Sequence, residues 1–150
     1  MRRSQVLRIC DANFNRSREG LRVCEEITRF VLEDKKLTTE LKRARHAVSD
    51  CIKKFPVSLS ELVGSRNVRS DVGRKYSKLE SGRGDALQLF LANAERVKES
   101  LRVLEETSKF IDSKFSERFK RTRFKVYAIE KKTLPKLEAL CHRRSGVRTK

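Results

Sequence analysis

Apolar residues recur along most of the chain at the spacing of an amphipathic α-helix. Residues 11–33, 38–54, 85–112 and 116–140 each carry Leu, Ile, Val, Phe or Cys at steps of three and four residues. We predict one helix over each range, with Asp11 as the N-cap of the first. The expected fold is therefore all-α, a bundle of helices.

The second pair of helices repeats the first. At an offset of 80, residues 11–32 and 91–112 carry the same amino acid at ten of 22 positions, and "LKRARHAV" (41–48) aligns with "FKRTRFKV" (119–126) after a slip of two. The shared positions of the first copy are Ala12, Asn13, Arg16, Glu19, Leu21, Arg22, Val23, Glu25, Glu26 and Phe30. Chance would give about one or two matches, so we infer that one domain contains a repeated helical hairpin, at 11–55 and 91–140.

The stretch that joins the two hairpins has a different composition. Residues 57–85 are richer in Gly and Ser and lack a clear apolar period. Pro56 is expected to end the second long helix, and we predict a short helix at 58–63 after it. Residues 64–85 are predicted to form a functional loop, because long loops inside compact domains commonly carry sites. The basic tail, residues 142–150, is expected to fray.

Polar residues interrupt the apolar face of the first helix in both copies. At about 100° per residue, Asn13 and Arg16 fall inside an arc of apolar residues that includes Phe30, while Glu25 falls on the opposite, charged face. In the second copy, Asn93 and Arg96 interrupt the arc in the same way. That arc consists of Ala94, Leu101, Val103, Leu104, Phe110 and Ile111.

The second helix of each hairpin also turns an arginine, Arg45 or Arg123, toward its apolar neighbours. An arginine in a core is costly unless an acid or a ligand compensates its charge. One interpretation is a structural network in which Glu19, Glu99 and their repeat partners neutralise the arginines. The other is a polar cleft at the interface of the two repeats that binds an anion. Repetition does not separate the two, because a symmetric bundle would duplicate either.

Charge and cysteine content narrow the classes of function. The net charge of +17 implies an anionic partner or ligand. The four cysteines match no zinc-site spacing, and Cys24 and Cys51 fall at apolar helical positions, so we expect reduced thiols in a cytoplasmic protein. No signal peptide and no apolar run long enough to span a membrane is evident.

The predicted loop carries phosphate-binding chemistry. In "SRNVRSDVGR", Arg66, Arg69 and Arg74 surround Asp71. Arginines match phosphate oxygens in bidentate geometry, and an acid among them would suit Mg²⁺ bound together with phosphates. Neither GxxxxGK[ST] nor GxGxxG is present, so the sequence supports neither a P-loop nor a dinucleotide fold.

These motifs together resemble one family. "DANFNRSREGLRVCEEITRFVLED", "LKRARH", "SRNVRSDVG" and "ANAERVKESLRVLEE" are similar to the strictly monofunctional hydroxymethylpyrimidine-phosphate kinases of thiamine biosynthesis, a domain often fused to thiamine-phosphate synthase. The resemblance implies transfer of the ATP γ-phosphoryl group to 4-amino-5-hydroxymethyl-2-methylpyrimidine phosphate, with ATP and Mg²⁺ required.

The resemblance also assigns roles to residues. It implies a catalytic set of Asp71, Arg66 and Arg83, with Asp71 as the metal ligand. It implies substrate-binding roles for Asn13, Arg16, Glu19, Arg45, Asn93, Arg96 and Glu99. Two positions depart from the family pattern: Asn67 replaces the usual Asp, and Arg74 follows "DVG" where a small hydroxyl residue is common. These departures would alter phosphate or metal binding in the loop.

Two rival functions remain. The charge of +17 would suit nucleic acid, but aromatic residues make up only 7% of the chain and its helices alternate Arg with Glu, which argues against this class. The second rival is a non-catalytic partner of a separate thiamine-phosphate synthase.

Overall fold

Five α-helices and one 3₁₀ turn form the described part of the chain. The computed structural model describes residues 1–67 and 84–146, with side chains to residue 142. The elements are α1 (Arg3–Phe30), α2 (Lys35–Lys54), α3 (Leu59–Gly64), α4 (Ala86–Thr107), η2 (Ser108–Phe110) and α5 (Ser113–Gly146). No strand occurs in these residues, so the predicted all-α fold is confirmed.

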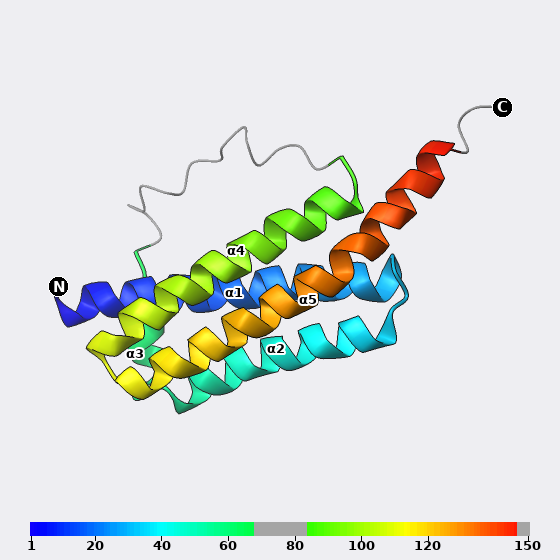
Figure 1. Ribbon diagram of the computed structural model, residues 1–150. Helices are drawn as coiled ribbons and strands as arrows, with labels where there is room; N and C mark the ends of the chain where they lie inside the picture. The colour runs from blue at the N-terminus through cyan, green and yellow to red at the C-terminus, as the bar shows by residue number, and fades with distance from the viewer. Residues whose placement is uncertain (68–83, 147–150) are drawn as a thin grey trace.

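The four long helices pack as a bundle of two antiparallel hairpins, α1–α2 and α4–α5 (Figure 1). α1 also runs antiparallel to α4. The thiol of Cys24, late in α1, donates to the carbonyl of Phe90, early in α4. At the other end, Cys10 Sγ lies 3.4 Å from Thr107 Oγ1. α2 and α5 are antiparallel as well. Along the bundle axis, α1, α2, α4 and α5 therefore run up, down, down and up. A long connection that contains α3 joins the end of α2 to the start of α4.

Side-chain caps mark the starts of α2 and α4. The side chain of Asp34 accepts a 2.9 Å hydrogen bond from Leu37 N at the start of α2, and Asp85 accepts one from Gln88 N at the start of α4. The prediction that Asp11 caps the first helix is wrong. α1 begins at Arg3, and Asp11 lies inside it, buried. The apolar residues Val6, Leu7 and Cys10 extend the buried face of α1 toward its N-terminus.

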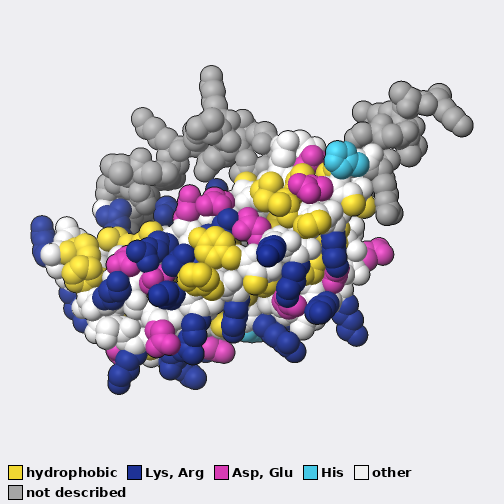
Figure 2. All heavy atoms as spheres, in the orientation of Figure 1, with side chains coloured by type: hydrophobic (Ala, Val, Ile, Leu, Met, Phe, Trp, Pro, Cys, Tyr) yellow, Lys and Arg dark blue, Asp and Glu magenta, His cyan; other side chains and the backbone are white. Residues whose placement is uncertain are grey.

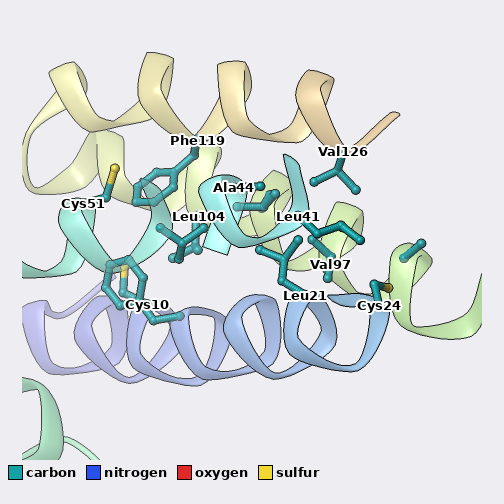
Figure 3. Close-up of a cluster of buried hydrophobic side chains, with 14 of the residues drawn as sticks. Cys10, Leu21, Cys24, Leu41, Ala44, Cys51, Val97, Leu104, Phe119 and Val126 are labelled. Carbon is teal, nitrogen blue, oxygen red and sulfur yellow. The ribbon is translucent and has the colours of Figure 1, made fainter. Parts of the chain in front are cut away.

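The core lies between the four long helices. Figure 3 shows side chains such as Leu21, Leu41 and Phe119 pointing toward one another from α1, α2 and α5. Cys10, Cys24 and Cys51 are buried free thiols, as predicted for the last two. Phe30 and Phe110, by contrast, are 62% and 68% exposed. Their predicted place in the buried apolar face is therefore wrong, and each is the last residue of its helical element.

The α1–α4 contact is close because of one small residue. A Cβ atom added to Gly20 would lie 2.7 Å from Val97 Cγ2 and 3.0 Å from the carbonyl oxygen of Asn93. Glycine therefore permits the two backbones to approach. We call this line of contact the α1–α4 seam. None of the helices among the described residues is both long and apolar enough to cross a membrane.

Candidate functional site

The inward arginines of the second helices are compensated by buried acids. Arg45 Nε lies 2.9 Å from Glu25 Oε2, and Arg123 Nη2 lies 2.8 Å from Glu105 Oε2. Both glutamates are at most 5% exposed. The two ion pairs occupy equivalent positions in the repeat, and each ties the two helices of one hairpin together.

This geometry corrects the prediction in two respects. Glu25 is buried and does not lie on the outer face. Glu19 and Glu99, predicted to neutralise the arginines, are exposed. The helical wheel fails at Glu25 because a second helix packs along that side of α1, which widens the buried arc beyond its apolar residues. The structural interpretation therefore accounts for Arg45 and Arg123.

The two asparagines are buried as predicted. Asn13 and Asn93 are 6% and 9% exposed, and each donates its amide N–H to a carbonyl one turn earlier, on Ile9 at 2.8 Å and Leu89 at 2.9 Å. The identical local hydrogen bond fixes both amides in the same orientation. Neither asparagine uses its full hydrogen-bonding capacity in that bond.

Arg16 and Arg96 are exposed, so their predicted place inside the core is wrong. Both arginines nevertheless lie beside the α1–α4 seam. Arg16 precedes Gly20 by four residues, and Arg96 follows Asn93 by three, which places each on the face of its helix that borders the seam. Buried amides and exposed guanidinium groups thus flank the same line of contact. We call the four residues Asn13, Arg16, Asn93 and Arg96 the seam strip.

Hollows on the surface of α1 divide the predicted substrate residues into two groups. One hollow of about 440 Å³ includes Asn13 and Arg16. Its complete lining is Gln5, Arg8, Ile9, Ala12, Asn13 and Arg16. A second hollow of about 410 Å³ contains Glu19 and Arg45. Asn93, Arg96 and Glu99 line neither of these two hollows.

An ion pair that the sequence did not predict lies at the start of the predicted loop. Arg66, just beyond α3, donates from Nε and Nη2 to the two carboxylate oxygens of Asp11, at 2.6 and 2.8 Å. The hydrogen bonds with Asp11 raise the pKa of Arg66 above its ordinary value. The sequence feature that could have indicated this ion pair is Asp11, an acid at the edge of the apolar face of α1. This pair fixes the N-terminal end of the loop on α1.

The rest of the predicted catalytic set cannot be placed. Asp71 and Arg83, like Arg69 and Arg74, lie outside the described residues. Within the described residues, no group of three or more His, Cys, Asp or Glu side chains could hold a metal ion. Asp11 does not fit Mg²⁺ either, because both of its oxygens already accept from Arg66.

Comparison with known proteins identifies relatives over most of the chain. Thiamine-phosphate synthase of Synechocystis sp. is 40% identical over 126 residues, which is 83% of this chain and 35% of the relative. The same enzyme of Rhodopirellula baltica is 40% identical over 124 residues, and that of Thermosynechococcus vestitus is 38% identical over 146 residues. The chain spans 32% to 40% of the length of these three relatives. No solved structure gives a significant match.

The ThiD2 family profile matches residues 8–132. This range includes the first copy of the hairpin and the second as far as residue 132, together with both buried Glu–Arg ion pairs, the seam strip and the Asp11–Arg66 pair. The match covers well over half of the chain, and the chain therefore belongs to the ThiD2 family.

Proposed function

We propose that this protein is a kinase that transfers the ATP γ-phosphoryl group to 4-amino-5-hydroxymethyl-2-methylpyrimidine phosphate and acts in thiamine biosynthesis. Membership of the ThiD2 family supports the pathway, as do the relatives named thiamine-phosphate synthase. The observation that carries the proposal is the seam strip, which pairs buried amides with exposed arginines in both repeats.

The chemistry of this reaction suits such a strip. The acceptor is an ionised phosphate, so the reaction requires little proton abstraction. It requires cancellation of the repulsion between two polyanions and alignment of the attacking oxygen with the leaving group. Exposed guanidinium groups of Arg16 and Arg96 would bind phosphate oxygens, and the fixed amides of Asn13 and Asn93 would orient the pyrimidine ring.

The Asp11–Arg66 pair gives the loop a defined start. Arg66 was predicted to be catalytic, but its guanidinium is bound by a buried carboxylate. We therefore assign Arg66 a positioning role: it holds the chain just before residues 68–83 against α1. Asp71 and Arg83 remain the proposed metal and phosphate ligands of that segment. Mg²⁺ would supply charge neutralisation on ATP.

The test is a coupled assay for ADP. Purified protein is mixed with ATP and Mg²⁺, with and without the pyrimidine phosphate. We expect ADP formation to depend on the acceptor. If ADP forms no faster with the acceptor than without it, the kinase proposal is wrong. Formation of the pyrimidine diphosphate would be followed by phosphorus NMR in the same mixture.

Variants test the seam strip. Arg16→Gln and Arg96→Gln should each lower kcat/KM about 100-fold, because each removes a charge that stabilises the transferring group. Arg43→Gln is the matched control: Arg43 is an exposed arginine of α2 without an ion pair in the described residues. Equal activity of all three variants would exclude the seam strip as the site.

A second candidate function follows from the partial coverage of the relatives. Because the chain corresponds to 35% of the Synechocystis thiamine-phosphate synthase, it could serve as a non-catalytic partner of such a synthase. This candidate predicts no acceptor-dependent ADP, together with a stable complex in gel filtration with purified thiamine-phosphate synthase.

A further inference from the structure

The contact between α2 and α5 is closed at one end by ion pairs. Lys132 Nζ on α5 lies 2.8 Å from Glu40 Oε2 on α2. One turn further, Lys136 on α5 pairs with Asp34. At this end, Lys132 and Lys136 of α5 thus each pair with an acid at or near the start of α2.

The other end of the same contact is a hollow of about 420 Å³ whose charged lining residues are mainly cations. Its lining is Ala47, Asp50, Cys51 and Lys54 from α2, and Arg118, Arg121, Thr122 and Lys125 from α5. Four cations therefore share the hollow with one acid, Asp50. Figure 2 shows Lys and Arg side chains, in dark blue, spread over α2 and α5 on the face that it presents.

The internal repeat makes the two ends directly comparable. At the offset of 78 that aligns residues 41–48 with 119–126, Glu40 corresponds to Arg118 and Lys54 corresponds to Lys132. The symmetry equivalent of the Glu40–Lys132 ion pair is therefore the combination of Arg118 with Lys54. An attractive ion pair at one end of the α2–α5 contact is thus replaced by two like charges at the other end.

The protein does little to compensate these charges. Among the residues that the structure describes, Lys54, Arg118 and Lys125 have no carboxylate within the 4.0 Å of an ion pair, and Arg121 Nε is 3.8 Å from Glu117 Oε1. Lys54 lies in the last turn of α2, where the helix dipole favours a cation, but the other three lie within α5. Like charges that face each other across a hollow repel, and a bound anion would remove that repulsion.

We propose that the α2–α5 hollow binds a diphosphate group, either free or at the end of a larger molecule. Four cations against one acid leave three excess positive charges, which suits a diphosphate better than a single carboxylate or sulfate. Two of the cations are arginines, whose planar guanidinium groups bind phosphate oxygens in pairs. The hollow lies between α2 and α5, whereas the seam strip belongs to α1 and α4, so this site is separate from the proposed kinase site.

Binding is tested with inorganic pyrophosphate at about 0.15 M salt, where long-range attraction is largely screened. Isothermal titration calorimetry gives the affinity, and ¹⁵N–¹H NMR gives the location. We expect the amide resonances of Ala47, Cys51 and Thr122 to shift. Parallel titrations with ADP and with sulfate test whether the diphosphate group is recognised in a nucleotide and whether a simple dianion suffices.

The repeat supplies the decisive variant. Arg118→Glu recreates at this end the Glu–Lys combination found at the other, so it should abolish pyrophosphate binding and raise the Tm of the anion-free protein. The double variant Arg121→Gln, Lys125→Gln tests the hollow without touching the contact of Arg118 with the ring of Phe115. We expect its Kd for pyrophosphate to rise at least tenfold. The charge-matched control is Lys120→Gln with Lys131→Gln, two exposed residues of α5 outside the hollow, whose Kd should stay within about twofold.

Four results would overturn the proposal. The first is equal weakening of pyrophosphate binding in the control and hollow variants, and the second is resonance shifts confined to α1 and α4. The third is loss of binding in Arg16→Gln but not in the Arg121→Gln/Lys125→Gln double variant. The fourth is sulfate binding as tight as pyrophosphate binding. The kinase assay separates the two proposals, because the hollow variants should retain full acceptor-dependent ADP formation even though they no longer bind pyrophosphate here.

Discussion

Substitution of Arg45 by glutamine should unfold the protein more readily and should affect a catalytic site little. Arg45 was predicted to bind substrate, but its guanidinium lies 2.9 Å from the buried carboxylate of Glu25. Removal of one partner of a buried ion pair leaves an uncompensated charge in the interior and costs about 3–5 kcal/mol. The cost here is smaller, because Arg45 is 19% exposed and Arg22 remains 3.5 Å from Glu25. We expect a loss of about 2 kcal/mol.

The second repeat contains a natural control. Glu105 accepts from Arg123 at 2.8 Å and also from Arg102 at 2.6 Å, so it keeps a close cation when Arg123 is changed. Arg123→Gln should therefore cost only about 1 kcal/mol. The predicted order of stability is wild type, Arg123→Gln, Arg45→Gln, although the two pairs occupy equivalent positions.

Urea unfolding followed by circular dichroism measures these differences. The midpoint should fall while the slope m stays constant, because neither variant changes the surface exposed on unfolding. For a chain of this length, about 2 kcal/mol corresponds to a decrease in Tm of about 4–8 °C. A double-mutant cycle with Glu25→Gln isolates the pairwise energy. A structural role for Arg45 is refuted if Arg45→Gln unfolds within about 0.5 kcal/mol of wild type yet loses acceptor-dependent ADP formation.

Other regions of the bundle give three more predictions. Gly20→Ala should cost about 1–3 kcal/mol because its Cβ would meet another helix at 2.7 Å, whereas Gly64→Ala, with no atom within 4 Å, should be neutral or stabilising; equal urea midpoints would contradict this. The hydrogen bond from Lys136 lowers the pKa of Asp34, so the stability that this carboxylate contributes is present at neutral pH and is lost as the pH falls through its lowered pKa. Asp34→Asn should flatten the dependence of Tm on pH in that range and retain the helix cap, and an unchanged profile would refute the linkage. Burial raises the pKa of the Cys24 thiol to about 12, so native protein at pH 8 should resist iodoacetamide at this residue, as peptide mass spectrometry would show.

The periodic pattern was sufficient to predict the bundle, because apolar spacing depends directly on helix geometry. The same wheel misplaced Glu25 and Arg16, and for related reasons. A wheel orders side chains around one helix but does not say where the neighbouring helices lie. Packing of α2 beside α1 buries Glu25, and the edge of the α1–α4 seam leaves Arg16 in solvent. Long polar side chains at the border of an apolar face are thus the positions that sequence periodicity decides least well.

The two repeats separate what the bundle requires from what only one half possesses. Residues shared between the copies make the same contacts twice: Glu25 and Glu105 each bind an arginine of the second helix, and Asn13 and Asn93 each bond to their own helix. Identity between the copies therefore reflects packing at least as much as function.

Departures from the repeat are more informative about a site. Asp11, which holds Arg66, corresponds to Leu91 in the second copy, and Glu40 corresponds to Arg118. A packing constraint alone would favour the same solution in both hairpins. The Asp11 carboxylate that binds Arg66, and the cationic end of the α2–α5 contact, each occur in only one half of the repeat instead. If the asymmetric positions carry function, then Leu91→Asp should leave turnover unchanged while Asp11→Leu reduces it. A loss of equal size in both variants would return Asp11 to a purely structural role.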